Sequence, residues 1–427
     1  ASYAGITSST ALNFTTESTV SDPFEDKAVV ALVEAQTEAP KRIIRDVTTP
    51  IFNRLQWLRN YSEDRDLFSQ GIKFRFSNPT LASIAKVVPV ALTDDEEVEE
   101  ETDSTWSFWS EGSVSIGKVG DTSDSYSKVI NTSGITIGLD NKVNDRYLYG
   151  YSIRYTKDDV DVGTPGTSLD TDAYSFSTYA TLLTGQNKFI EGIFGASKLD
   201  LKHIRKSGSN TLYGDRNGAQ LYGSIHYITT LSRNNLNISP NIKVDLSQTY
   251  LKEYSETGTD ALSYDDQTIK NGAIYSGISL NNTFKFNNIN FVPNAGIELG
   301  IDFSPSSDVS ITYVSDPNTP YMRSIDQQES KSGKVKLGFD IITQMGFSLS
   351  TLYERNQSEN SYSDTFYLGT AYITLSEAQY ALSIKDNVAS ADYVKKLNGF
   401  DITFDTDYNL FSEYPEYEIN LKISSIF

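Results

Sequence analysis

The sequence predicts an all-β fold: an antiparallel transmembrane β-barrel of 12, or alternatively 14, strands with an N-terminal, mainly helical segment. From Trp106 to Phe427, apolar and polar residues alternate with a period of two, as in strands that have one apolar face. The chain has 27 tyrosines and 21 phenylalanines but is only 38% hydrophobic. A barrel in lipid needs apolar groups only at every second position, and aromatic rings suit its two interfaces.

The connections distinguish this barrel from a soluble sandwich, which would show the same alternation. Tight turns rich in Gly and Asn broadly alternate with long polar connections at 120–128, 158–172, 253–267 and 305–330. A barrel with short periplasmic turns and long outer loops has this pattern. A sandwich has no reason to sort its loops in this way, so the barrel is favoured.

The bulk composition excludes other classes of protein. The net charge of −20 leaves no basic stripe for nucleic acid. No apolar run reaches the 18 or so residues of a transmembrane helix. The chain has no cysteine, which fits an oxidising compartment. It begins at Ala1 without methionine, so we expect a mature or excised fragment whose export signal lay upstream.

Two zones are expected before the barrel. Residues 1–21 are rich in Ser and Thr and are expected to be a passenger remnant or disordered leader. Residues 22–104 are expected to form a helical plug or linker. Asp22-Pro23-Phe24-Glu25 predicts a helix start, Pro40 is expected to stop this first helix, and a second helix is expected over 41–60, with a new turn or kink at Pro50. Residues 72–76 suggest a short strand, and eight acids within 94–103 mark the boundary before the barrel.

The barrel is expected over residues 105–427. Its first twelve strands are centred on 106–116, 135–139, 147–155, 174–182, 190–196, 216–231, 242–246, 274–280, 295–301, 335–341, 347–353 and 366–372. Residues 376–427 supply a possible extra hairpin, with strands near 400–408 and 417–427, and hence the alternative count of 14.

The end of the chain resembles the signal by which the barrel assembly machinery recognises outer-membrane proteins. Apolar residues occupy alternate positions before a terminal aromatic, although Ser425 departs from the pattern. The residues of this expected signal are Tyr417, Ile419, Leu421, Ile423 and Phe427. The alternative is an ordinary final strand that ends in phenylalanine by chance.

Internal motifs resemble the opening of the autotransporter β-domain. These are the Trp-led strand Phe108-Trp109-Ser110-Glu111-Gly112, the "GxxxGxD" strand of residues 135–140 and the "Gxxxxy" strand of residues 149–155, in the family's order. Residues 250–258 are similar to the family's mid-barrel Tyr/Glu/Gly segment. The resemblance covers roughly 106–375 and the terminal strand.

The resemblance implies a twelve-stranded barrel that carries a passenger to the cell surface, with a helix threaded through its pore. We expect the basic residues Arg42, Arg45, Arg54 and Arg59 of that helix to face lumen acids, for which Asp245, Glu298 and Asp302 are candidates. The alternative is that residues 22–60 pack elsewhere. The implied location is the outer membrane of a Gram-negative bacterium. The implied partners are outer-membrane lipid, the barrel assembly machinery, periplasmic chaperones and the chain's own passenger, and a monomer is expected.

No enzymatic chemistry, cofactor or metal is predicted. His203 and His226 are the only histidines and lie in no hydrolase motif, so incidental roles are expected. Asp158, Asp159, Asp161, Asp170 and Asp172 lack the spacing of a calcium loop, and a solvated acidic loop is expected. The functional alternatives to a translocator are a stand-alone channel or porin, and a surface adhesin or enzyme built on the outer loops.

Overall fold

The computed structural model describes most of the chain. The described ranges are 21–60, 72–76, 106–144, 146–163, 166–233, 235–286, 289–326, 330–343, 347–372, 378–385, 388–397, 400–409 and 417–425. Residues 1–20 of the expected leader, the acidic run and Phe427 lie outside the described residues. Within these ranges, no helix is both long enough and apolar enough to cross a membrane.

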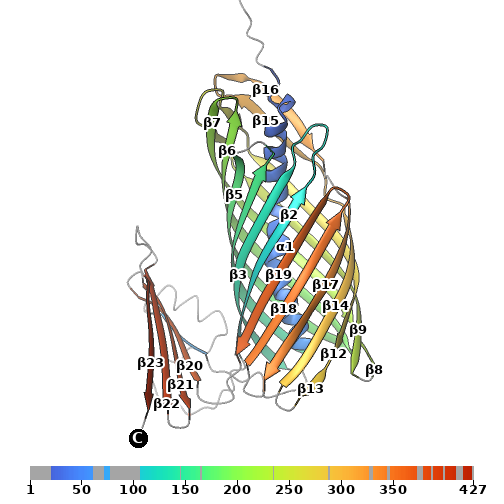
Figure 1. Cartoon of the computed structure of the whole chain (residues 1–427), viewed down its shortest axis with the longest axis vertical. Coiled ribbons are helices and arrows are strands. Elements are labelled where there is room, and N and C mark those ends of the chain that lie inside the picture. Colours follow the sequence, from blue (N-terminus) through green and yellow to red (C-terminus); the bar gives the residue numbers. More distant parts are fainter. Residues whose placement is uncertain are drawn as a thin grey trace, which may run out of the picture.

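Twelve antiparallel strands of the described chain form a closed barrel, in which each strand pairs with the next around the ring (Figure 1). The ring closes because β19 pairs with β2 at eleven register positions and β9 pairs with β12 at sixteen. All twelve expected strands are confirmed. They are β2 (Trp106–Val119), β3 (Lys128–Asn144), β4 (Tyr147–Val162), β5 (Thr167–Gly185), β6 (Lys188–Ser207), β7 (Asn210–Thr229), β9 (Leu236–Leu251), β12 (Gln267–Asn282), β14 (Ile289–Asp302), β17 (Lys331–Thr343), β18 (Phe347–Ser358) and β19 (Ser361–Tyr372).

The barrel is apolar outside and polar inside. Large apolar side chains on the outer face are exposed, for example Ile153 at 58%, Phe194 at 61% and Leu299 at 72%. Polar neighbours one residue away, such as Arg154, are buried in the lumen. A protein in water would bury its apolar face, whereas lipid covers the outside of a membrane barrel. Because the sheet has no free edge, its backbone groups pair within the wall, as a bilayer requires.

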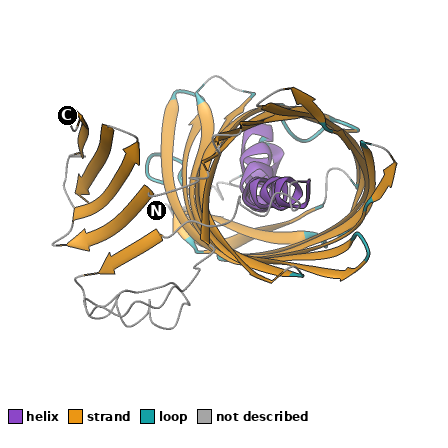
Figure 2. Cartoon of the chain, turned by 90° about the horizontal axis from the view of Figure 1, so that it is seen from below, coloured by secondary structure: helices purple, strands orange, loops and turns teal. Residues whose placement is uncertain are grey.

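A single long helix, α1 (Lys27–Asn60), lies inside the barrel after a short 3-10 turn, η1 (Pro23–Glu25) (Figure 2). The predicted start is confirmed in its cap, because the Asp22 carboxylate accepts the Phe24 N–H at 2.9 Å. The prediction that Pro40 ends a first helix was wrong, since Pro40 and Pro50 both lie inside α1. A proline disfavours a free helix by about 3 kcal/mol. Here the residue is enclosed by the wall, and the Gln220 side-chain amide donates to the Pro40 carbonyl at 2.9 Å.

The long connections gather at one end of the barrel. Two of them form a four-stranded outer sheet from β10 (Tyr254–Ser255), β11 (Leu262–Tyr264), β15 (Ser307–Tyr313) and β16 (Asp316–Ile325). This sheet shares an apolar cluster with Phe24, Val30 and Val33, so it packs over the start of α1 (Figure 1). Short turns, with the small strands β8 (Leu231–Arg233) and β13 (Phe284–Phe286), lie at the other end.

One expected long loop is much shorter in the structure. Residues 158–172 were expected to be a polar loop, but β4 continues to Val162 and β5 begins at Thr167. The strands extend because their inward positions are stabilised inside the barrel. Val160 and Leu169 pack in the core, and the Asp158 carboxylate is neutralised there by a helix arginine.

The chain after β19 leaves the barrel. β20 (Ala378–Lys385), β21 (Val388–Leu397), β22 (Phe400–Asn409) and β23 (Tyr417–Ser425) form a separate five-stranded sheet with β1 (Ile72–Phe76), outside the ring (Figures 1 and 2). The short strand expected at 72–76 is confirmed. The barrel therefore has twelve strands and not fourteen, because β2 and β19 occupy each other's edges and leave none for a further hairpin.

Candidate functional site in the barrel lumen

The helix α1 follows one wall of the lumen, formed by β3 to β7 (Figure 2). Most of its side chains are buried, and they include polar and charged groups as well as Leu32, Ile43, Ile51 and Leu55. A charge that is removed from water is costly unless an opposite charge or hydrogen bonds compensate it. The charged partners on the wall therefore determine where the helix can lie.

Three arginines of α1 each bind one buried acid of this wall. Arg54 makes a bidentate contact with Asp140 of β3, with Nε–Oδ2 at 2.8 Å and Nη2–Oδ1 at 2.9 Å. The partner of Arg42 is Asp158 of β4, with Nη2–Oδ2 at 2.7 Å, and the partner of Arg59 is Glu191 of β6. The three acids have exposed side-chain fractions of at most 1%. Each of these carboxylates is therefore compensated by an arginine of the helix and not by hydration.

The motif residues of β2, β3 and β4 lie around the Arg54–Asp140 ion pair, near the C-terminal end of α1. The Trp109 indole donates to the Tyr179 hydroxyl at 2.8 Å, and that hydroxyl lies 3.3 Å from the Asp140 carboxylate. A Cβ at Gly138 would overlap the Trp109 ring, and one at Gly150 would overlap Tyr179. The two glycines therefore make room for the aromatic side chains that position Asp140, the acid that binds the helix.

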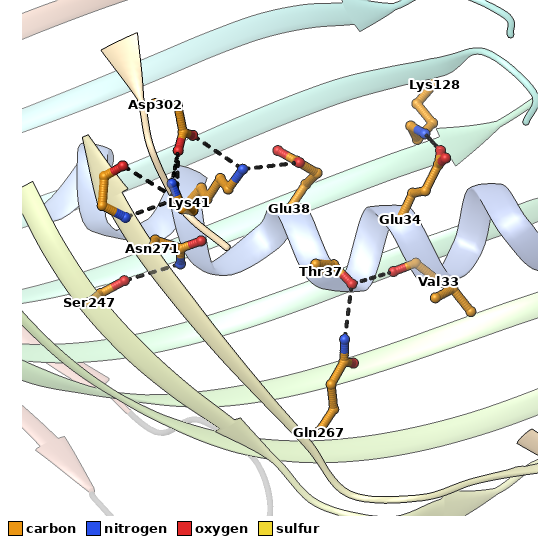
Figure 3. A network of polar contacts seen from close by, with 12 residues as sticks. Val33, Glu34, Thr37, Glu38, Lys41, Lys128, Ser247, Gln267, Asn271 and Asp302 are labelled. Atoms are coloured by element: carbon orange, nitrogen blue, oxygen red, sulfur yellow. Dashed lines mark hydrogen bonds and ion pairs between the residues drawn. The ribbon is translucent and has the colours of Figure 1, made fainter. Parts of the chain in front are cut away.

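The upper half of α1 is held by a second set of polar contacts (Figure 3). Lys128 of β3 lies 2.5 Å from the Glu34 carboxylate, and Lys41 lies 3.2 Å from Asp302. The Gln267 amide donates to the Thr37 hydroxyl at 3.2 Å. These contacts come from β3, β12 and β14, so the helix is fixed from more than one side at this level.

The predicted basic residues lie in the lumen, but most of the predicted acids bind elsewhere. Of the three acids, Asp302 contacts the helix, through Lys41. Asp245 lies 3.0 Å from Lys243, and Glu298 lies 3.1 Å from Lys334, both lysines of the wall.

The fourth predicted basic residue, Arg45, interacts electrostatically with Asp46 of the helix and Glu354 of β18. Sequence reasoning missed Asp140, Asp158 and Glu191 as partners. Alternation gives the inward direction of these acids, but it does not give their height in the barrel.

The residues of the expected terminal signal are not part of the lumen. Tyr417, Ile419, Leu421 and Ile423 lie on β23, in the sheet outside the barrel, and Phe427 lies outside the described residues.

The two histidines are both partnered with buried acids. His203 Nε2 lies 3.1 Å from Glu256, which also binds Arg205 at 2.6 Å, and His226 Nδ1 lies 3.2 Å from Glu191. Glu256 belongs to the long connection between β9 and β12, at the outer end. Its burial would raise its pKa, but the hydrogen bonds from Arg205 and His203 prevail and lower the pKa to about 2. This cluster ties the outer connection to β6.

Within the described ranges, no group of three or more His, Cys, Asp or Glu side chains is arranged to hold an ion. The aspartates considered for calcium lie on paired strands. Asp159 and Asp170 face each other across β4 and β5, and Asp172 accepts a hydrogen bond from Tyr155 at 2.6 Å.

Comparison with known proteins agrees with this architecture. The model of the autotransporter β-domain family matches residues 108–354. No curated protein sequence matches the chain. The translocator domain of the autotransporter NalP from Neisseria meningitidis is similar at 13% identity, with a TM-score of 0.52, and the match covers 62% of this chain and 88% of that one. The β-domain of the Bordetella autotransporter BrkA is similar at 15% identity, with a TM-score of 0.49, over 64% and 100% of the two chains.

Proposed function

The chain belongs to the autotransporter β-domain family, and from this premise we propose how its barrel and helix export and anchor a passenger. The protein is a translocator barrel of the Gram-negative outer membrane, which carries an N-terminal passenger to the cell surface. The barrel belongs to a transport family, and its own part in export makes or breaks no bond. What the passenger does is a property of the passenger.

The single observation that carries the proposal is the occupied lumen. A helix of 34 residues lies inside a closed ring and is bound to the wall by buried ion pairs at three heights. The segment before it begins at the end where the long connections lie, and the Ser21 carbonyl accepts a hydrogen bond from Tyr313 of the outer sheet at 3.0 Å. A chain that ends export in this position has its N-terminal part outside and its barrel in the membrane.

We propose that export ends with α1 lying inside the lumen, and that the helix serves two purposes there. It anchors the passenger, because a helix bound by buried ion pairs leaves the lumen only if those charges separate. It also fills the lumen, so the pore does not stay open after transport. The pairs Arg42–Asp158, Arg54–Asp140 and Arg59–Glu191 are the proposed anchoring contacts.

We further propose that periplasmic chaperones deliver the chain and that the barrel assembly machinery inserts it as a monomer. The apolar outer face needs protection from water until it reaches lipid. A monomer is supported by the closed ring, in which none of the twelve barrel strands has a free edge for a second copy. The proposed recognition element remains Tyr417, Ile419, Leu421, Ile423 and Phe427.

The export direction is tested with an epitope tag placed before Ala1 in cells that display the full chain. The tag should be labelled by antibody and removed by protease added to intact cells. As the matched control, the same tag is inserted at Asn187, in the short turn between β5 and β6, where it should be reached only after the outer membrane is opened. A tag before Ala1 that stays protected while the Asn187 tag is accessible would reverse the orientation and exclude the proposed export.

A further inference from the structure

The outer face of the barrel has an uneven distribution of charge. Six neighbouring strands, β12, β14, β17, β18, β19 and β2, form one side of the wall. Within these described strands, the outward charged residues all lie near the end of the long connections. They are four cations and one acid: Lys118, Lys270, Lys331, Arg355 and Asp364. In a chain with a net charge of −20, this side of the barrel therefore has an excess of positive charge.

The corresponding end of β4 to β7 has the opposite balance. Its outward charged residues are six aspartates and four lysines: Asp159, Asp161, Asp170, Asp172, Asp200, Asp215, Lys157, Lys198, Lys202 and Lys206. Lys202, for example, lies opposite Asp170 on one neighbouring strand and opposite Asp215 on the other. An anionic ligand at the outer surface is therefore attracted to the first side of the barrel and repelled by the second.

Three of the cations lie close together on adjacent strands. The strands β2, β19, β18 and β17 are neighbours in this order (Figure 1), and Lys118 pairs with Tyr362 across β2 and β19. The register from β19 to β17 places Arg355 two residues below the row of this pair and Lys331 two residues above it. With strands about 4.8 Å apart and a rise of about 3.4 Å per residue, the three Cα atoms are about 12 to 16 Å from one another. We call Lys118, Lys331 and Arg355 the cationic belt.

The belt combines one fixed cation with two free ones. The Arg355 guanidinium lies 4.2 Å from the Tyr362 ring centroid and binds the Asp364 carboxylate, so its position is determined by its neighbours. Lys118 and Lys331 are exposed. No ion pair with an acid is found for either lysine among the described residues, so both ammonium groups are available to a partner.

The belt lies directly above the surface that contacts lipid. Ile116, two residues below Lys118, is 57% exposed, and Tyr353, two residues below Arg355, is 41% exposed. Apolar side chains of this kind face the hydrocarbon, and a tyrosine at their upper limit marks the interface. The cations of the belt therefore lie at the level where the hydrocarbon ends and the lipid headgroups begin.

From this arrangement we propose that the cationic belt binds the phosphorylated headgroup of a glycolipid in the outer leaflet of the outer membrane. Lysine side chains reach from the apolar surface to the headgroup region, and each one near an anionic membrane surface strengthens binding. The spacing of the belt suits a headgroup with two phosphates. The proposal depends on the orientation proposed above, with the long connections outside, and it goes beyond export because it gives the barrel one preferred lipid-binding side.

The test is native mass spectrometry of the full chain in detergent micelles with diphosphoryl lipid A, and separately with monophosphoryl lipid A. Wild type should bind the diphosphoryl form more tightly. The double variant Lys118→Gln and Lys331→Gln should lose affinity for it by about tenfold or more, because two cations near the phosphates are removed. The matched control is Lys198→Gln with Lys202→Gln, which removes the same charge from the acid-rich side and should change the affinity less than about twofold.

A second pair of substitutions separates loss of charge from loss of structure. Lys118→Arg with Lys331→Arg keeps both charges and should bind like the wild type, and all variants should keep the heat-modifiable migration of a closed barrel. Inorganic pyrophosphate at the same concentration as the lipid should leave the lipid bound.

Four outcomes overturn the proposal. They are equal binding of the two lipid A forms, unchanged binding in the glutamine variant of the belt, an equal loss in the control variant, and displacement of the lipid by pyrophosphate, which would identify a site for soluble phosphate. Because binding is measured in micelles, its result is independent of the tag experiment that tests export.

Discussion

At the scale of single residues, the ion pairs between α1 and the wall are buried, and their burial determines what they contribute to stability. The Arg54 and Asp140 side chains are 5% and 1% exposed. Replacing such a pair by two apolar groups often changes stability little, but removing one partner leaves an uncompensated buried charge. The pairs therefore determine the position of the helix more than they add to its affinity. Arginine suits this role because its planar group binds a carboxylate through two hydrogen bonds.

Arg54→Met is expected to lower the free energy of unfolding by about 3 kcal/mol, because Asp140 then remains charged and buried. The measurement is a urea titration in detergent micelles followed by tryptophan fluorescence, which is suitable because the Arg54 guanidinium lies 4.7 Å from the Trp57 ring centroid. Adding Asp140→Asn to Arg54→Met should restore a large part of the loss, since it removes the unpaired charge.

The matched control is the exposed pair Arg355–Asp364, whose side chains are 37% and 34% exposed. Arg355→Met should cost less than about 1 kcal/mol, as is usual for ion pairs in contact with solvent. Equal losses for Arg54→Met and Arg355→Met would contradict the view that burial makes the helix contacts important.

The lowered pKa of Glu256 predicts that the connection between β9 and β12 becomes less stable in acid. Its pKa is lowered from 4.5 to about 2, so the charged form is favoured in the folded state. The resulting stabilisation, roughly 3 kcal/mol by linkage, is complete above pH 4.5 and is lost as the pH falls toward 2. The protection factors of residues 253–264 against hydrogen exchange, taken relative to the intrinsic exchange rate at each pH, should therefore fall across this window. Glu256→Gln should have lower protection factors at neutral pH, and these should lose most of their pH dependence; a variant as acid-sensitive as the wild type would contradict this assignment.

At the scale of elements, the sequence predicts well which face of a strand a side chain lies on. It predicts poorly which distant residues that side chain contacts. All twelve barrel strands follow from alternation, because the period of two is a local property of each strand. The end of the first helix at Pro40 was predicted wrongly, since the barrel wall that encloses this residue, including Gln220, which donates to the Pro40 carbonyl, is distant in sequence. The partner acids were missed for the same reason. Alternation shows that Asp140 points inward, but only the register of the closed barrel places it beside Arg54.

The two prolines of α1 predict that this helix depends on the barrel. A peptide of residues 27–60 should show little helical circular dichroism in water, because each proline costs about 3 kcal/mol relative to alanine and the wall contacts are absent. The double substitution Pro40→Ala and Pro50→Ala in the peptide should raise the helical signal markedly. A wild-type peptide that is already largely helical would show that the helix forms without the wall.

At the scale of the whole molecule, the chain divides into a barrel that closes at β19 and a sheet outside it. The segments that flank the barrel in sequence meet in this sheet, because β1, between α1 and β2, pairs with β20 in parallel. Closure depends only on pairings among the twelve barrel strands, in which the β2–β19 pair joins the first strand to the last. Completing the ring therefore requires nothing from residues 376–427, whereas the proposed assembly signal lies within them.

Truncating the chain after Leu375 should separate closure of the barrel from recognition by the assembly machinery. Purified truncated chain should still fold into detergent micelles and keep the heat-modifiable migration of a closed barrel, because all twelve barrel strands are intact. In cells, its level in the outer membrane should fall strongly, because the proposed signal at Tyr417–Phe427 is missing. Both levels are measured by immunoblot of membrane fractions alongside the full chain.

A matched pair of triple variants distinguishes loss of the signal from loss of the sheet. Ile419, Leu421 and Ile423 changed together to alanine should reproduce the cellular defect, whereas Glu418, Asn420 and Lys422 changed to alanine should not, since the two sets occupy opposite faces of the same strand. If the truncated chain reaches the outer membrane at the normal level, the signal lies elsewhere. β19, the strand that closes the ring and exposes Phe366 and Leu368 on its outer face, is then the segment to alter.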